Sequence, residues 1–285
     1  MHEQFRSAAL QSPERPDTFF AFVTGLYAAT LVSPAAIIGL GAWVSDDAGV
    51  LYFGMLAAIT LIVSVVTWGV RRWRGLPERL GASSLSWGLA LVPVFVIGLY
   101  FLLVAQVDAP GADAGALVGF FLGLLGILVG IGLAVMARNR YTAAVIDESV
   151  VTCEWTAGWP EPLRTRLQYL AIVGMLGFVG ALVLHAVSNV EWVYPVAQAL
   201  FVPAIALANL GQPRTYRATP AGLERRYPAS RYVYGWDAFE GYTVTDDTIV
   251  IHWRSWWRPA LQCARADLDD EQAVQTALTD SLPLV

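Results

Sequence analysis

The chain has 285 residues, of which 56% are hydrophobic and only 14% are charged, whereas about a quarter of the residues in an ordinary globular protein are charged. This composition excludes a soluble globular protein as the default class, and it also excludes a disordered chain. Two cysteines are too few for a disulfide scaffold, and a net charge of -5 is not the basic balance that holds nucleic acid.

A polar tail over residues 1–18 is followed by six long apolar runs. About 20 apolar residues in a helix cross the hydrocarbon core of a bilayer, and a helix satisfies its own backbone hydrogen bonds there. The sequence therefore predicts six membrane-spanning helices, at 19–44, 50–70, 85–106, 115–136, 167–187 and 192–210. The polar tail precedes the first run, so we expect no secretory signal.

The basic residues, all 18 of them arginine, occur in alternate connecting segments. They occupy the amino-terminal tail, the segments 71–84 and 137–166, and the region after residue 210. The other three loops contain acidic residues and no arginine: Asp46, Asp47, Asp108, Asp113 and Glu191. Because positive loops stay on the cytoplasmic side, we expect a multi-pass protein of the cell membrane with both termini in the cytoplasm.

Two cytoplasmic regions have a strand-like pattern. In the segment 137–166, residues 141–146 and 150–155 flank Asp147-Glu148-Ser149 and predict a β-hairpin that could pack beside the carboxy-terminal region. The region 211–285 predicts five strands, at 215–219, 223–227, 236–244, 248–254 and 260–265. A closing helix follows, capped by Asp267 or Asp269, with its apolar face formed by Val274, Ala277, Leu278 and Leu282. The predicted fold class is thus a six-helix membrane bundle with a small α+β domain.

Several strand and turn patterns carry a family resemblance: Tyr216-Arg217-Ala218-Thr219, the turn into Gly222-Leu223, Trp236-Asp237, the Asp246-Asp247 turn, and the aspartate-rich start of the last helix. With the two preceding spans they resemble the bacterial pleckstrin-homology-like membrane proteins, in particular the YcxB-like group. The resemblance covers residues 141–285 and leaves the first four spans outside. It implies a pleckstrin-homology-like fold for the cytoplasmic domain, and it implies no chemistry.

The sequence shows no catalytic or metal-binding motif. His2, His185 and His252 are not spaced as metal ligands, and Cys153 and Cys263 are expected to be free thiols. The six predicted spans contain no Asp, Glu, Arg or Lys, although ion pumps, proton-coupled carriers and intramembrane hydrolases generally need such groups. We therefore expect a protein that is not an enzyme and has no cofactor or metal.

The fourth predicted span carries a stripe of glycines, Gly115, Gly119, Gly123, Gly126 and Gly130. Such a stripe lets another helix approach closely. It predicts either packing against a neighbouring helix of the same chain or, as the second choice, a homo-oligomer face. Pro34 and Pro93 interrupt two other spans and predict kinks.

The segment 252–258, His-Trp-Arg-Ser-Trp-Trp-Arg, is the most unusual part of the predicted domain. Tryptophan rings and guanidinium groups suit an anionic membrane surface, so the candidate lipid-surface residues are Arg254, Trp256, Trp257 and Arg258. The alternative is that these rings pack in the β core or against the predicted hairpin at 141–155. The run Arg71-Arg72-Trp73-Arg74 has a similar composition, but the topology already explains it.

The sequence as a whole favours a non-enzymatic membrane scaffold or regulator. Its cytoplasmic domain would bind a protein partner or lipid headgroups. The alternative is a transporter or channel for a small neutral or hydrophobic solute, with the domain as its gate. That alternative requires a polar cavity at mid-membrane near Pro34, Pro93 or Gln198.

Overall fold

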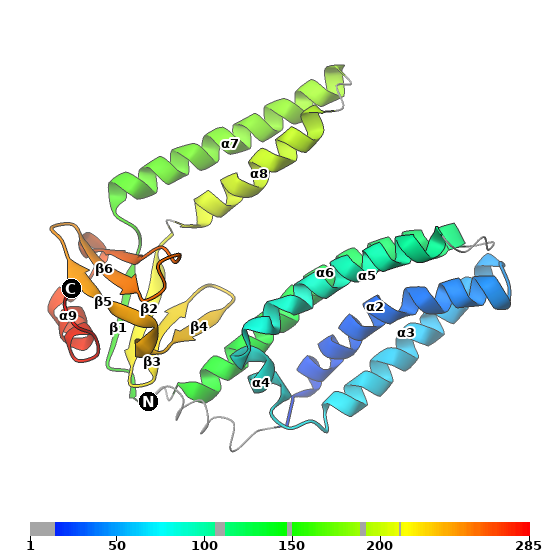
Figure 1. The fold of residues 1–285 in the computed structure, drawn as a ribbon, viewed down its shortest axis with the longest axis horizontal. Helices are drawn as coiled ribbons and strands as arrows, with labels where there is room; N and C mark the ends of the chain where they lie inside the picture. The colour runs from blue at the N-terminus through cyan, green and yellow to red at the C-terminus, as the bar shows by residue number, and fades with distance from the viewer. Residues whose placement is uncertain (1–14, 106–111, 147–149, 189–191, 211) are drawn as a thin grey trace. The chain divides into compact units, whose positions relative to one another are not determined.

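The computed structural model describes residues 15–105, 112–146, 150–188, 192–210 and 212–285. Its contacts divide the chain into two compact units (Figure 1). The helical unit comprises Glu3–Asp147 with Pro228–Tyr232, and the second unit comprises Glu148–Tyr227 with Val233–Val285. Each unit is described by itself below.

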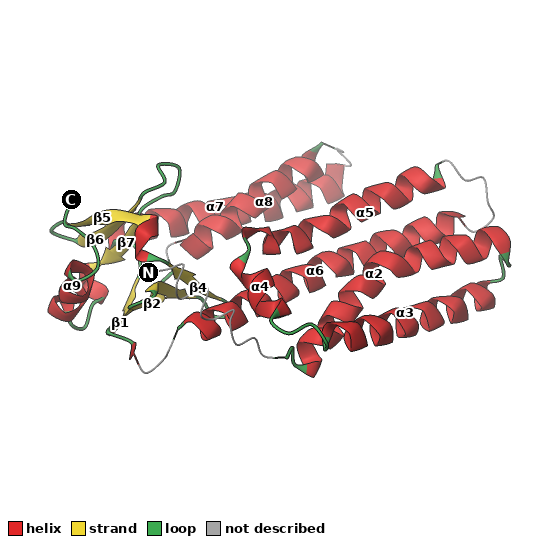
Figure 2. Cartoon of the chain, turned by 60° about the horizontal axis from the view of Figure 1, so that its bottom comes forward, coloured by secondary structure: helices red, strands yellow, loops and turns green. Residues whose placement is uncertain are grey.

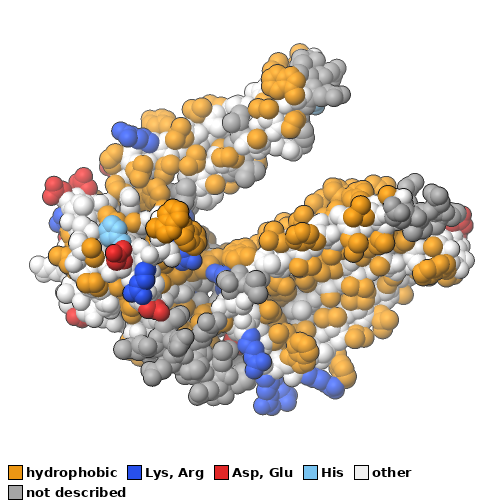
Figure 3. Space-filling model, in the orientation of Figure 1, with side chains coloured by type: hydrophobic (Ala, Val, Ile, Leu, Met, Phe, Trp, Pro, Cys, Tyr) orange, Lys and Arg blue, Asp and Glu red, His pale blue; other side chains and the backbone are white. Residues whose placement is uncertain are grey.

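All six predicted apolar runs form helices. They are α2 (Thr18–Trp43), α3 (Ala48–Val70), α5 (Gly88–Val104), α6 (Ala112–Val145), α7 (Glu161–Ser188) and α8 (Val193–Leu210). Among the described residues, α2, α3, α6 and α7 are long and apolar enough to cross a membrane, whereas α5 and α8 contain shorter apolar stretches. Many large hydrophobic side chains of these helices are exposed, and hydrophobic atoms are spread over their visible faces (Figure 3).

Aspartates begin the first two helices. The Asp17 carboxylate accepts a hydrogen bond from the Phe20 N–H at 2.6 Å, and the Asp47 carboxylate accepts from the N–H groups of Gly49 and Val50. These carboxylates satisfy backbone donors that have no partner within the helix. The polar residues that bound the apolar runs thus also fix where the helices start.

Helix α6 differs most from its predicted bounds. It continues as a helix to Val145, so the strand predicted at 141–146 is wrong. A short helix that we did not predict, α4 (Leu76–Ala82), packs on this extension. Gly81 makes the contact close, because a Cβ there would lie 2.2 Å from the Ala137 carbonyl oxygen. Packing against α4 therefore accounts for the longer helix, and the predicted turn 147–149 lies outside the described residues.

The described residues form seven strands, which cluster near α9 in Figure 2. Six of them lie wholly in the second unit, whereas the first half of β4 belongs to the range 228–232 of the helical unit. A four-stranded sheet has the order β1-β2-β3-β4, and a three-stranded sheet has the order β5-β6-β7. The pairs β1–β2, β2–β3, β5–β6 and β6–β7 are antiparallel. The strands are β1 (Cys153–Ala157), β2 (Arg214–Thr219), β3 (Gly222–Arg226), β4 (Arg231–Tyr234), β5 (Phe239–Val244), β6 (Thr248–Trp253) and β7 (Leu261–Ala264).

The segment before α7 does join the carboxy-terminal strands. Strand β1 pairs with β2, with Cys153 opposite Ala218 and Ala157 opposite Arg214. Helices α7 and α8 pack on each other and are inserted in the chain between these two strands. The second strand of the predicted hairpin therefore exists, two to three residues later than expected, but its partner is β2.

Two details of the carboxy-terminal prediction change. Strand β4 was missed, and Trp236–Ala238 forms a 3-10 turn ahead of β5 instead of the start of that strand. Helix α9 (Glu271–Thr279) is capped by Asp270, whose carboxylate accepts from the Ala273 N–H. Asp267, one of the two predicted caps, instead accepts from the Gly158 N–H at 2.8 Å.

The two sheets and α9 enclose one hydrophobic core. Its most buried large side chains come from both sheets and the helix: Tyr216, Leu223, Phe239, Ile249, Ile251 and Leu278. Trp155 of β1 stacks on Tyr216 of β2 with ring centroids 5.8 Å apart. The core therefore includes Trp155, which precedes the helix pair α7–α8 in the sequence, together with residues that follow that pair.

Candidate functional site

The candidate site is the loop between β6 and β7, and its base is firmly packed. The Trp253 ring stacks on Phe239 with centroids 4.5 Å apart and meets the Tyr234 ring edge-on at 4.8 Å. Its indole N–H donates to the Pro259 carbonyl oxygen at 3.0 Å. The Trp253 side chain, which is only 9% exposed, thus joins both ends of the loop to the core.

The tip of the loop has the opposite character. Trp256 is 94% exposed and Trp257 is 64% exposed. The Arg258 guanidinium lies 4.8 Å from the centroid of the Trp257 ring and 5.0 Å from that of the Trp253 ring. Exposing two large rings to water is unfavourable unless something else covers them. Of the two sequence alternatives, core packing therefore describes Trp253, and surface exposure describes Trp256 and Trp257.

The backbone fixes the loop between these two parts. The Arg254 N–H donates to the Ala238 carbonyl at 3.0 Å, and the Arg258 N–H donates to the Ser255 carbonyl at 3.1 Å. Both arginine side chains are exposed. The structure thus brings Arg254, Trp256, Trp257 and Arg258 together on one short, cationic and apolar tip, which we call the tryptophan tip.

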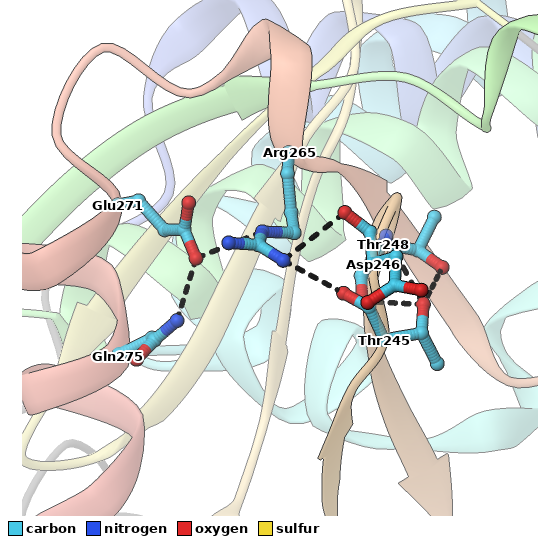
Figure 4. A network of polar contacts seen from close by, with 6 residues as sticks. All are labelled: Thr245, Asp246, Thr248, Arg265, Glu271 and Gln275. Atoms are coloured by element: carbon cyan, nitrogen blue, oxygen red, sulfur yellow. Dashed lines mark hydrogen bonds and ion pairs between the residues drawn. The ribbon is translucent and has the colours of Figure 1, made fainter.

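A cleft of about 780 Å³ in this unit lies between the start of α7 and the β5–β6 turn. Its charged lining is mixed, with Arg164 and Arg265 beside Glu161, Asp246 and Asp267. The Arg265 guanidinium is already engaged, because it pairs with Glu271 at 2.9 Å and donates to the carbonyls of Thr245 and Asp246 at 3.0 Å (Figure 4). This network joins the β5–β6 turn to α9, so Arg265 has a structural role.

Two side chains of the second unit that could act as nucleophiles, Cys263 and Tyr216, are buried. Burial raises the pKa of the Cys263 thiol to about 11 and that of the Tyr216 hydroxyl to about 12. Cys153 and Cys263 are free thiols. Within the described ranges no three His, Cys, Asp or Glu side chains are grouped so that they could hold a metal ion.

In the helical unit, the glycine stripe of α6 lies against α2 and α5. A Cβ at Gly115 would meet Ile38 of α2, and one at Gly123 would meet Ile97 of α5, both within 2.5 Å. The remaining stripe residues contact both helices: Gly119 contacts Tyr100 and Pro34, Gly126 contacts Thr30 and Pro93, and Gly130 contacts the Leu89 carbonyl and Tyr27. The stripe is thus occupied within the chain.

Two tyrosines add hydrogen bonds to this contact of α6 with α2 and α5, which we call the seam. The sequence analysis did not single them out. Pro93 has no N–H to offer the Leu89 carbonyl one turn earlier, and the Tyr27 hydroxyl of α2 donates to that carbonyl at 2.7 Å. Reciprocally, Tyr100 of α5 donates to the Leu31 carbonyl of α2, close to Pro34. The signal in the sequence would have been a tyrosine inside one apolar run together with a proline inside another.

We compared the chain with protein-family models, with curated proteins and with solved structures, and nothing matched it. The resemblance to the pleckstrin-homology-like group therefore has no support from these comparisons.

Proposed function

We propose that the chain is a non-enzymatic membrane scaffold or regulator whose second unit is a pleckstrin-homology-like domain. The support is the arrangement of the strands: a four-stranded and a three-stranded sheet closed by one carboxy-terminal helix. In this proposal α5 and α8 also cross the membrane, which gives six crossings. The arginine distribution then puts both termini in the cytoplasm.

The ligand of this domain in our proposal is the anionic headgroup region of the membrane, and the tryptophan tip binds it. The observation that carries the proposal is the exposure of Trp256 and Trp257 beside Arg258 on a loop anchored through Trp253. Indole rings favour headgroup depth, and each arginine near an anionic surface contributes about 1 kcal/mol. The domain is tethered through α7 and α8, so even a weak contact is populated.

The packing of the helical unit supports a scaffold over a carrier. Pro34 and Pro93 are covered by the glycine stripe, since Cβ atoms at Gly119 and Gly126 would lie 3.4 Å from the two proline rings. A carrier would need a polar mid-membrane cavity near one of these prolines or near Gln198. Close contact at both prolines leaves little room for a solute path beside them.

The test uses the full chain in nanodiscs, because β1 belongs to the domain and a fragment beginning after α8 would lack it. An environment-sensitive fluorophore is attached at Trp256→Cys in a Cys153→Ser background. We expect blue-shifted emission in discs containing phosphatidylglycerol but not in pure phosphatidylcholine, and loss of that shift with Arg254→Gln and Arg258→Gln. The same label at Gln272→Cys, exposed on α9, is the matched control.

Equal emission from position 256 in the two kinds of disc would contradict the proposal. So would a shift that persists without both arginines, because it would show that the rings respond to something other than anionic headgroups.

A further inference from the structure

A groove of about 790 Å³ lies between the start of α2 and the end of α3 in the helical unit. Four arginines line one part of it: Arg15, Arg71, Arg72 and Arg74. Arginine side chains gather around this end of α3 in Figure 3. The groove is thus a concave site that carries four positive charges, and none of its lining residues is acidic.

Nothing in the described part of the chain neutralises this charge. The four arginines form no ion pair with any described carboxylate. Asp17, two residues after Arg15, is already engaged, because one of its carboxylate oxygens caps α2 and the other pairs with Arg140. Like charges in one concavity repel, and an anion bound there would relieve that repulsion.

The position of one guanidinium is already set. Arg72 lies over the Trp68 ring, 3.5 Å from its centroid. This cation–π contact holds a flexible side chain on the wall of the groove before any ligand binds. A guanidinium offers paired donors that match the oxygens of a phosphate, so a preset Arg72 favours a phosphate ligand.

The rest of the groove is lined by Pro16, Phe22, Val63 and Trp68 together with the hydroxyl residues Ser64 and Thr67, and it lies on helices that are able to cross a membrane. Phe22 of α2 is 47% exposed and Trp68 of α3 is 60% exposed, and Val63 lies between the two helices. The wall is fixed by close helix contact, since a Cβ at Gly25 would lie 2.8 Å from the Val63 carbonyl oxygen. One end of the groove therefore suits an anion and the other suits a hydrocarbon chain.

We propose that this groove binds one anionic phospholipid. The phosphate lies among Arg71, Arg72 and Arg74, and an acyl chain follows Phe22 and Val63. Topology alone explains why arginines follow α3, but it does not explain a concave site that joins them to an apolar wall. A soluble anion would use the arginines and leave the apolar wall uncovered.

The test is photo-crosslinking of the purified full chain with phosphatidylglycerol that carries a diazirine on its acyl chain, followed by peptide mass spectrometry. Phosphatidylcholine with the same acyl group is the neutral comparison. We expect crosslinks in residues 63–68 with phosphatidylglycerol, and at least a tenfold weaker signal with Arg71→Gln/Arg72→Gln. The matched control is Arg164→Gln/Arg166→Gln, which removes two arginines at the start of α7 and should leave the signal unchanged.

A second variant guards against misfolding of the arginine double mutant. Ser64→Trp fills the groove, leaves all four arginines in place, and should also abolish the crosslinks. Equal labelling by the two lipids, labelling that survives both variants, or full competition by soluble glycerol phosphate would each overturn the proposal. The site lies in the helical unit, so its failure would leave the tryptophan tip untouched, and failure of the tip would leave this groove untouched.

Discussion

The two units keep their shape in opposite ways. Where α6 meets α2 and α5, contact depends on missing side chains, because a Cβ at Gly130 would lie only 2.3 Å from the Leu89 carbonyl oxygen. In the second unit, contact depends on large side chains such as Phe239 and Ile251, which are at most 1% exposed. Lipid gives helices no hydrophobic reason to associate, whereas water gives the sheets a strong one. The first unit should therefore be sensitive to added atoms, and the second to lost ones.

The largest expected effect comes from removing a ring in the second unit. Phe239→Ala deletes a side chain that stacks on Trp253 and also meets Tyr234. We expect the free energy of unfolding of this unit to fall by about 3–5 kcal/mol, measured by denaturant unfolding of the full chain in detergent. Trp256→Ala removes a larger ring that is 94% exposed, and it should change stability little. Similar losses from both variants would refute the distinction between base and tip.

A second test measures whether the core of the second unit excludes water from the Cys263 thiol. Burial raises the pKa of Cys263 from 9.0 to about 11. The unfolded thiol therefore loses its proton first as the pH rises, and folding stability should fall between pH 9 and 11. The expected loss is about 2–3 kcal/mol, and Cys263→Ala should remove it from the stability profile. A profile that is unchanged by this substitution would mean that the thiol is solvated.

The helical unit should be broken by adding atoms to the seam. Gly130→Val places methyl groups against the Leu89 carbonyl, and overpacking of this kind costs about 1–3 kcal/mol. Gly132→Val in the same helix is the matched control, because a Cβ there would meet no atom within 4 Å apart from the adjoining backbone of its own helix. Thermal unfolding in detergent should separate the two variants. If both unfold alike, the stripe does not hold the unit together.

The smallest expected effect comes from the hydrogen bond between Tyr27 and the Leu89 carbonyl. Tyr27→Phe removes the donor to the Leu89 carbonyl, a loss of about 0.6–1.7 kcal/mol for a hydrogen bond between membrane helices. Pro93→Ala returns a backbone N–H that can serve the same carbonyl. Tyr27→Phe should then cost almost nothing in the Pro93→Ala background, and unfolding of the four forms in a double-mutant cycle measures this coupling. Equal costs in both backgrounds would show that the tyrosine does not replace the missing N–H.

The sequence predicted those features that depend on hydropathy. All six apolar runs are helices, because continuous apolar side chains and the need to satisfy backbone groups act on every residue of a run. The end of α6 was harder to predict, since Arg138 and Asn139 suggest an exit from the membrane but do not end a helix. Contact with α4 through Gly81 keeps that end helical, and single-chain patterns do not show such a contact.

The candidate sites were predictable in composition but not in geometry. The Trp-Arg pattern identified the loop at 252–258, yet only packing separates Trp253 from Trp256 and Trp257. The arginines after α3 were visible in the sequence as a topology signal, whereas the groove that they line needs Phe22 from another helix. Strand β4, Arg-Tyr-Val-Tyr, was missed because four residues of half-polar character carry little alternation.

The insertion of α7 and α8 between β1 and β2 sets an order of events during biosynthesis. Strand β1 leaves the ribosome well before its partner, and at about 5–20 residues per second the delay is on the order of seconds. Trp155 of β1 remains without its β2 partner while the apolar helices α7 and α8 are synthesised. If α7 and α8 both cross the membrane, as we propose, β1 can pair with β2 only after the chain has returned to the side on which β1 lies, and completion of the sheet then checks the insertion of both helices.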